Sequence, residues 1–260
     1  MTFTIDLEDR RALVTGAGQG VGLSIARSLA AAGAVVAVND IRPEQAEAAV
    51  EELRGAGGRA DALPFDVTDW EQVSTAVDGY GGVDILVNNA GNAGAAGFAA
   101  IANFVESDPA DWARYFAVNL FGVMHCTRAA LPSMISSGGG RVITIVSDAS
   151  RYGDAKLAPY AAAKAGAAGL SRSIAREVGR HAITVNCVSL GTIETPATAR
   201  PPAVTTEEKE AERVALRPYV IRRRGKPDDV AGLVTFLSSP LAAWITGQTY
   251  AVNGGYTFSL

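Results

Sequence analysis

The chain has 260 residues, of which 48% are hydrophobic and 19% are charged, and its formal net charge is −4. This balance can form a substantial buried core and excludes a disordered polymer, while 28 glycines without an every-third-residue period exclude a collagen-like chain. An acidic pI of about 5.3 argues against a protein that binds nucleic acid.

Targeting and redox signals are weak in this sequence. No apolar stretch approaches the roughly 20 residues of a membrane-spanning helix, and residues 1–11 lack the apolar core of a secretory signal. Cys126 and Cys187 lie in apolar segments and are expected to be buried thiols, and His125 and His181 are too few for a histidine-rich metal site. We therefore expect a cytoplasmic protein with no membrane, nucleic-acid or metal partner.

Apolar runs rich in β-branched residues alternate with amphipathic segments along the whole chain. The runs predict strands at residues 11–15, 35–38, 62–65, 83–87, 141–146, 183–188 and 249–252. The segments between them predict helices at residues 20–32, 43–54, 70–77, 109–135, 159–180 and 227–237. This alternation predicts an α/β fold, in which residues 1–260 form a single doubly wound Rossmann-type domain. Its parallel sheet should have about seven strands with helices on both faces. Residues 195–216, which are rich in proline and charge, are expected to be a substrate lid within that domain.

A glycine-rich turn follows the first predicted strand and opens the first predicted helix. Gly16, Gly20 and Gly22 leave room for the backbone to turn sharply and to approach a pyrophosphate. The helix N-terminus offers unpaired N–H groups and a partial positive charge, and Gln19 and Val21 lie in the same turn. Because a strand precedes this turn and another strand follows the helix, the pattern favours a dinucleotide-binding loop over a tight structural turn.

Asp40 follows the second predicted strand, 18 residues after the last of these glycines. A carboxylate there can accept hydrogen bonds from both hydroxyls of an adenosine ribose and would repel a 2′-phosphate. Residues 17–19 contain neither lysine nor arginine, so NAD is the expected cofactor and NADP is less favoured. Arg42 weakens this preference, and Asp40 has the alternative interpretation of a turn residue before Pro43.

Tyr160 and Lys164 are four residues apart on a predicted helix and therefore share one face. A neighbouring ammonium group favours the phenolate and lowers the pKa of a tyrosine, so such a pair can give or take the proton of an alcohol. The pair alone is weak, because this spacing often arises by chance. Ser147 strengthens it, since this serine ends a predicted strand at the sheet edge where ligands bind in such folds.

With these residues identified, the chain resembles the short-chain dehydrogenase/reductase family over nearly its whole length. The resemblance rests on five motifs in the family's order, which are Thr15–Gly22, Asn88–Gly91, Asn119, Ser147 and Tyr160–Lys164. It implies an NAD(H)-dependent oxidoreductase that interconverts a secondary alcohol and a ketone by hydride transfer. The chain is similar to 3-oxoacyl reductases and to hydroxyacyl-CoA dehydrogenases, and the resemblance implies a homo-oligomer, either a tetramer or a dimer.

The resemblance also implies catalytic roles for the matching residues. Tyr160 would be the general acid/base, and Lys164 would bind the nicotinamide ribose and lower the pKa of that tyrosine. Ser147 would hydrogen-bond the substrate oxygen, and Asn119 would hold a water molecule of the proton relay.

Two further groups of residues are implied to bind the adenosine half of the cofactor. Asp66 and Val67 would contact the adenine. Asn88, Ala90 and Gly91 would line the adenosine side and support the sheet.

On the nicotinamide side, Ile193 and Thr195 are implied to reach the carboxamide from a turn that contains Gly191. The family commonly has proline where this chain has Leu190. Asp148 occupies a position where a second serine or another small residue is common, and its carboxylate would either contact a polar substrate or cap the loop.

Residues 92–108, 148–159 and 195–216 are expected to select the substrate. An apolar pocket with basic residues at its rim would suit a hydroxyacyl or oxoacyl thioester, and Arg151 would either lie at that rim or be an ordinary surface charge. A steroid, a sugar or another alcohol is the alternative substrate. Two other functional classes stay open, a non-catalytic NAD-binding regulator and a methyltransferase whose loop holds S-adenosylmethionine.

Overall fold

Seven parallel strands form one sheet within residues 4–91, 103–195 and 204–258, which the computed structural model describes. The strands are β1 (Arg11–Val14), β2 (Val35–Val38), β3 (Arg59–Ala62), β4 (Ile85–Asn88), β5 (Gly140–Ser147), β6 (Ile183–Leu190) and β7 (Thr249–Val252). Their order across the sheet is β3-β2-β1-β4-β5-β6-β7. All four residues of β4 and seven of the eight in β6 are buried, as a parallel sheet covered on both faces requires. The predicted doubly wound Rossmann-type fold is confirmed.

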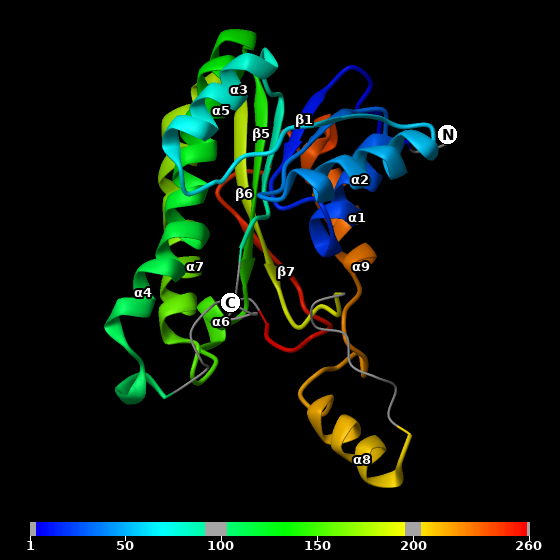
Figure 1. Ribbon diagram of the computed structural model, residues 1–260, viewed down its shortest axis with the longest axis vertical. Coiled ribbons are helices and arrows are strands. Elements are labelled where there is room, and N and C mark those ends of the chain that lie inside the picture. Colours follow the sequence, from blue (N-terminus) through cyan, green and yellow to red (C-terminus); the bar gives the residue numbers. More distant parts are fainter. Residues whose placement is uncertain (1–3, 92–102, 196–203, 259–260) are drawn as a thin grey trace.

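Helices form a layer on each side of the sheet (Figure 1). One layer contains α1 (Gly20–Ala31), α2 (Pro43–Gly55) and α9 (Pro227–Ser238), and the other contains α3 (Trp70–Tyr80), α5 (Gly122–Ser137) and α7 (Ala158–Val178). Ile25 and Leu29 of α1 pack with Val230 and Val234 of α9 in the first core cluster, and all four side chains are fully buried. A core on each face of the sheet packs the strands against the helices. This packing fixes the positions of the loops that follow the strand ends.

The strand order places a topological switch between β1 and β4. From β1 the chain proceeds outward through β2 and β3, and it then returns to the other side of β1 and proceeds through β5, β6 and β7. The loops after β1 and β4 consequently leave the sheet side by side at its carboxyl edge. In such folds this edge binds the ligand.

Several element boundaries differ from those that the sequence patterns predict. The third strand is Arg59–Ala62, three residues before the predicted 62–65, because Leu63 and Phe65 belong to the segment that follows the strand and are held there through their carbonyls by Asn39. The predicted helix 109–135 consists of α4 (Pro109–Phe116), a π-helical turn η2 (Ala117–Phe121) and α5. A four-residue helix, α6 (Ala149–Tyr152), was not predicted.

The predicted lid is described in part. Residues 196–203 lie outside the described residues, and the rest contains α8 (Thr206–Ala215), which begins with a capping box between Thr205 and Glu208. In Figure 1 this helix projects from the end of the molecule where the carboxyl ends of β5 and β6 lie, and it buries no residue against the body. No helix of the described residues is long and apolar enough to cross a membrane.

Candidate active site

The loop between β1 and α1 forms a cradle that only glycine permits at key positions. Gly16 and Gly20 have φ angles of +61° and +60°, which side chains rarely adopt. A Cβ atom at Gly16 would lie 2.9 Å from Ala90 Cα. A Cβ atom at Gly22 would overlap the Gly16 carbonyl oxygen and the side-chain amide nitrogen Nδ2 of Asn89. No acidic side chain lies in the first turn of α1 and no side chain caps it, so its N–H groups are open to an anion.

Asn89 fixes the backbone of this cradle. It belongs to the motif Asn88–Gly91, but the sequence alone suggested no role for it. Its backbone N–H donates to Thr15 Oγ1 at 3.0 Å, and its side-chain amide donates to the carbonyl oxygens of Thr15 and Gly16 at 2.9 and 3.0 Å. The loops after β1 and β4 are thereby joined at the switch point. The sequence did contain a signal for this role, because Asn89 is a polar residue that directly follows the end of β4.

One cavity of about 350 Å³ lies beside this loop and is lined by the residues predicted for the adenosine side except Asn88. It is lined by Gly16, Gln19, Asn39, Asp40, Ile41, Arg42, Phe65, Asp66, Val67, Asn89, Ala90, Gly91 and Val118. Asp66 Oδ1 accepts hydrogen bonds from the backbone and hydroxyl of Thr68, both at 2.8 Å, which fixes the loop after β3 against the cavity.

Asp40 is 6% exposed and presents one carboxylate oxygen to the phosphate loop. Its Oδ1 accepts from the backbone N–H of Arg42 at 3.1 Å and lies 3.5 Å from Nε of the same residue. Its Oδ2 lies 2.7 Å from where a Cβ at Gly18 would be. This oxygen therefore faces the space next to the glycine loop, where a ribose hydroxyl would have to donate.

A second cavity of about 330 Å³ holds the predicted catalytic residues. It is lined by Gly16, Gln19, Gly20, Val21, Gly22, Asn89, Gly91, Ile145, Val146, Ser147, Tyr160, Lys164, Leu190, Gly191, Ile193 and Thr195. Four lining residues are shared with the adenosine cavity, so the two form one continuous crevice across the carboxyl edge of the sheet. Ser147 comes from the end of β5, and Tyr160 and Lys164 come from the first turns of α7.

Burial controls the protonation of the catalytic residues. Burial raises the pKa of Tyr160, a hydrogen bond with Ser147 opposes that rise, and the charge of Asp154 adds to it. Lys164 is 3% exposed, and burial lowers its pKa to about 8. Its Nζ donates to the carbonyl oxygen of Ile145 at 2.8 Å and lies 6.0 Å from the centroid of the Tyr160 ring. In this structure Ser147, rather than Lys164, is the neighbour that favours the phenolate.

Asn119 lies in the π-helical turn and is completely buried. Its side-chain amide donates to the carbonyl oxygen of Tyr115 at 3.0 Å. A Cβ at Gly91 would lie 2.8 Å from Asn119 Oδ1 and 2.9 Å from Lys164 Nζ, so both polar groups approach the backbone of Gly91. The structure therefore brings these two residues together at the backbone of Gly91, while the predicted water relay stays a prediction.

The turn after β6 brings the predicted carboxamide residues to the same cavity. A Cβ at Gly191 would lie 3.0 Å from Asn253 Cα, which explains the glycine. Thr195 lies beside Gly20 of the phosphate loop, and Ile193 forms a β-bridge with Gly225. The backbone pairing with Gly225 fixes this turn even though Leu190 stands where the family commonly has proline.

Asn88 lies apart from the other predicted residues. It is 2% exposed and lines neither cavity, and its Nδ2 donates to Thr127 Oγ1 of α5 at 3.0 Å. The structure therefore ties this residue to the packing of β4 on α5. This contact agrees with the predicted support of the sheet. The predicted role on the adenosine side stays a prediction.

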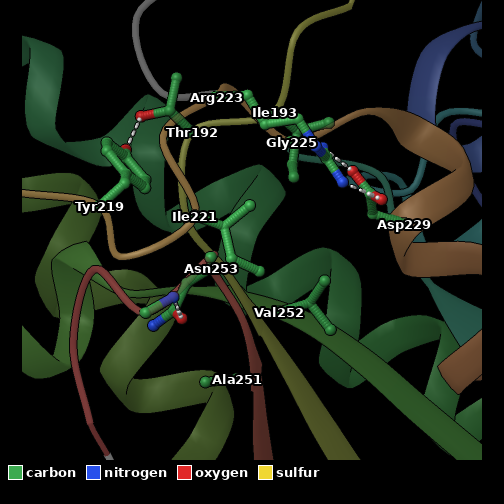
Figure 2. Close-up of a pocket in the computed structure, with 12 residues that line it drawn as sticks. Thr192, Ile193, Tyr219, Ile221, Arg223, Gly225, Asp229, Ala251, Val252 and Asn253 are labelled. Carbon is green, nitrogen blue, oxygen red and sulfur yellow. Dashed lines mark hydrogen bonds and ion pairs between the residues drawn. The ribbon is translucent and has the colours of Figure 1, made fainter. Parts of the chain in front are cut away.

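A third cavity, of about 340 Å³, lies on the other side of Ile193 (Figure 2). Tyr219 closes one end of it and donates its hydroxyl to Thr192 Oγ1 at 2.8 Å, and the Arg223–Asp229 ion pair closes the other. The segment after β7, beginning at Asn253, forms a further wall. This cavity was not anticipated, because it depends on contacts between segments that are distant in the sequence.

Comparisons with known proteins agree with this geometry. The family described as enoyl-(acyl carrier protein) reductase matches residues 16–257. The chain is 38% identical to the 7alpha-hydroxysteroid dehydrogenase of Escherichia coli over 253 residues, which cover 96% of this chain and 94% of that protein. It is 35% identical to the 3-oxoacyl-acyl-carrier-protein reductase of Thermotoga maritima over 253 residues, covering 96% and 98% of the two chains. A solved gluconate 5-dehydrogenase from Burkholderia cenocepacia, in complex with NADP and tartrate, superposes with a TM-score of 0.87 at 34% identity, with 98% of each chain covered.

The chain belongs to the short-chain dehydrogenase/reductase family. It is an oxidoreductase, an alcohol dehydrogenase or ketoreductase that acts on small-molecule alcohols and ketones with a nicotinamide cofactor.

Proposed function

We propose that the enzyme interconverts a secondary alcohol and a ketone with NAD(H), and that Tyr160 is its general acid/base. The observation that carries this proposal is the crevice itself, in which Asp40 lines one cavity, Ser147, Tyr160 and Lys164 line the other, and the glycine cradle lies between them. Neither the cradle nor the catalytic end is explained by a structural role alone, because the cradle excludes side chains and the catalytic end buries an ammonium group.

The residues present fit a nicotinamide dinucleotide. The open N-terminus of α1 suits the pyrophosphate, Asp40 suits the adenosine ribose, and Lys164 suits the nicotinamide ribose. When bound, the cofactor supplies the hydride acceptor or donor.

The remaining chemistry belongs to the protein. In alcohol oxidation the Tyr160 phenolate takes the hydroxyl proton, and in ketone reduction the phenol returns it to the carbonyl oxygen. Ser147 Oγ would hold the same oxygen of the substrate. The Ser147 hydroxyl already hydrogen-bonds Tyr160, so the two groups are close enough to bind one oxygen atom together. Lys164 would bind the nicotinamide ribose. Its effect on the pKa of Tyr160 stays a prediction, because its Nζ lies 6.0 Å from the centroid of the tyrosine ring and donates to the carbonyl oxygen of Ile145.

Replacement of Tyr160 by phenylalanine tests the mechanism. Because the ring is kept and only the hydroxyl is lost, kcat should fall by about 100-fold to 10,000-fold while the Kd for NADH changes little. Tyr80→Phe removes a hydroxyl far from the crevice and is the matched control. Full turnover by the Tyr160→Phe enzyme would contradict the proposed mechanism.

The proposed preference for NAD over NADP rests on Asp40. Its Oδ2 is placed to accept from a ribose hydroxyl, and its charge opposes a 2′-phosphate. The Asp40→Ser variant should therefore bind NADH about 10-fold to 100-fold more weakly and NADPH more tightly, because hydrogen bonds to a charged acceptor contribute about 1.5–3 kcal/mol each. Fluorescence titration of both cofactors measures this. An unchanged ratio of the two affinities would contradict the assignment.

We further propose a hydroxyacyl or oxoacyl thioester as substrate. The similarity to a 3-oxoacyl-acyl-carrier-protein reductase supports this class, and the similarity to a 7alpha-hydroxysteroid dehydrogenase supports a ring alcohol as the second candidate. The basic rim expected from the sequence gives less support than anticipated. Arg151 lies 3.9 Å from Asp148, Arg213 makes two hydrogen bonds of 2.7 Å with Glu210, and Arg200 lies outside the described residues.

A substrate screen separates the candidates. Hydroxyacyl-CoA compounds, steroid alcohols and sugar alcohols should be tested with NAD, and the corresponding ketones with NADH. Tight NADH binding without turnover of any compound would favour the regulator, and binding of S-adenosylmethionine instead of NADH would favour the methyltransferase.

The proposal includes a cytoplasmic homo-oligomer, either a tetramer or a dimer. Both cysteines are buried and carry free thiols, which suits a reducing compartment. Large apolar side chains on the outer surface of α5, among them Met124 at 41% exposed, support an interface on that helix.

A further inference from the structure

The carboxylate of Asp148, next to Ser147 in the chain, is buried and hydrogen-bonded to two distant segments of the chain. It is 2% exposed. Its Oδ1 accepts from Ser189 Oγ of β6 at 2.6 Å, and its Oδ2 accepts from Asn253 Nδ2 at 2.5 Å and from Thr257 Oγ1 at 3.0 Å. Its side chain makes no capping bond to α6, and its hydrogen bonds all go to β6 and to the C-terminal residues.

These contacts make the position of the carboxylate highly specific. A buried carboxylate is costly unless hydrogen bonds or an opposite charge compensate it. Here the compensation comes from two hydroxyls, one amide and the Arg151 guanidinium at 3.9 Å. Any displacement of the C-terminal segment would remove two of these donors at once. The segment Asn253–Phe258, which we call the C-terminal strap, is therefore held against the turn that carries Ser147.

The strap has a second set of contacts, which Tyr256 makes with the segment after Ser147 and with Tyr219. The Tyr256 hydroxyl donates to Asp154 Oδ1 at 3.2 Å, and its ring lies 5.5 Å from that of Tyr152, centroid to centroid. On its other side the Tyr256 ring lies 5.0 Å from that of Tyr219, which bonds Thr192 in the turn after β6. Figure 2 shows Tyr219 and Asn253 on different walls of the third cavity. The strap thus bridges the segment after Ser147 and the turn that lines the catalytic cavity.

We propose that Asp148 is a positioning residue for Ser147, and that through it the C-terminal strap helps to hold the turn that carries Ser147 in place. The inference rests on the proposed function of Ser147. The turn has two other restraints, since Asp148 N–H donates to the Leu190 carbonyl at 2.9 Å and Ala149 N–H donates to Ser147 Oγ at 3.2 Å. A turn held by its backbone alone would let Ser147 Oγ shift relative to Tyr160, and shifts of about 1 Å can cost about 100-fold in rate.

Substitutions at both ends of the contact test the proposal. Asp148→Asn keeps the shape but places an N–H group against one of the donors, and Thr257→Val removes a hydroxyl without changing the side-chain volume much. Each should lower kcat for the best substrate of the screen by about 10-fold, while the Kd for NADH stays within about 2-fold. Thr257→Ser keeps the hydroxyl that Thr257→Val removes, and it should keep kcat close to that of the unmodified enzyme. The double variant should be little worse than Asp148→Asn alone, because both changes break one network.

A structural control separates positioning from general destabilisation. Ser28→Ala removes the partly buried 2.7 Å contact between the Ser28 and Thr235 hydroxyls, which lies between α1 and α9. It should lower Tm without lowering kcat. Equal losses of kcat in Ser28→Ala and Asp148→Asn at matched stability would overturn the proposal, as would a kcat of Asp148→Asn within about 2-fold of the unmodified enzyme.

Hydrogen exchange provides a readout that needs no turnover. The backbone N–H groups of Gly255 and Tyr256 are bonded within the strap to Asn253. They should exchange faster in Asp148→Asn than in the unmodified protein or in Ser28→Ala. If the unmodified enzyme turns over no alcohol or ketone, the proposed function fails while exchange still reports the contact. If exchange in the strap is unchanged by Asp148→Asn, the linkage itself is wrong.

Discussion

At the scale of single residues, the most costly feature of the site is a buried ammonium group. Lys164 is almost completely buried, and its Nζ bonds the carbonyl oxygen of Ile145 instead of a carboxylate. A residue that only stabilised the fold would be better replaced by an apolar side chain, because the desolvation of a charge exceeds the gain from one hydrogen bond to a neutral acceptor. Its presence is therefore an argument for function.

We predict that Lys164→Met raises the stability of the cofactor-free protein at pH 7. Burial lowers the pKa of Lys164 from 10.5 to about 8, so the folded state disfavours the charged form below pH 8. This cost, about 3 kcal/mol before the loss of the bond to Ile145, is relieved as the pH rises from about 8 to about 10.5. Because the lost bond has a charged donor and is worth about 1.5–3 kcal/mol, the net gain should be about 1 kcal/mol at pH 7 and should shrink above pH 8. Urea unfolding at pH 7 and pH 9.5 measures it. A difference that does not change with pH would contradict the explanation.

At the scale of elements, the β1–α1 turn illustrates how backbone proximity sets the cofactor site. The cradle depends on the two loops after β1 and β4, which meet at the switch point, and the glycines are required where one backbone approaches the other. Some helical glycines elsewhere have no such requirement. A Cβ at Gly79 of α3 would meet no atom within 4 Å.

Two alanine substitutions should therefore have opposite effects. Gly22→Ala inserts a Cβ against the Gly16 carbonyl and Asn89, and overpacking of this kind costs about 1–3 kcal/mol. If that cost is confined to the loop, NADH binding should weaken by about 5-fold to 100-fold. Gly79→Ala should instead stabilise the protein by about 0.5–1 kcal/mol with no effect on binding. Thermal unfolding and NADH titration of both variants provide the comparison. Unchanged NADH affinity in Gly22→Ala would show that the loop adjusts freely.

The sequence patterns predicted the order of the elements because buried parallel strands and proline- or glycine-bounded helices leave strong local signals. They did not place the third strand, since Arg59–Ala62 is a short edge strand with polar residues and the apolar residues follow it. They also could not show the π-helical turn around Asn119, because one extra residue in a turn leaves the helical periodicity almost intact.

For the site, the motifs predicted most of the residues that line the crevice, because three of them lie at strand ends and Tyr160–Lys164 lies in the first turns of α7. The network of Asp148 could not be predicted, since its partners lie 41, 105 and 109 residues away in the chain. Asn88 shows the converse limit. A motif places the residue in the right loop, but only the packing on Thr127 shows that its side chain points away from the crevice.

At the scale of the whole molecule, apolar side chains remain exposed on two separate surfaces. Met124 and Ile135 of α5 are 41% and 40% exposed, and Trp244, in the turn before the edge strand β7, is fully exposed. Isolated exposed apolar residues are common, but a completely exposed tryptophan beside an unpaired strand edge favours association.

We predict that the protein in solution has two or four times the 26.9 kDa mass of one chain, and that the surface of α5 contributes an interface. Met124→Glu adds a charge that an apolar interface could not hold without a partner, so it should shift the protein to a smaller species. Val105→Glu places the same charge at a residue that is 90% exposed on the short helix Phe104–Glu106, and it should leave the mass unchanged. Light scattering coupled to size-exclusion chromatography measures the mass of each variant.

Because the crevice is lined by residues of one chain, the smaller species should still bind NADH. A protein that elutes with the mass of a single chain before any substitution would contradict the prediction, whereas loss of NADH binding on dissociation would show that the interface supports the site.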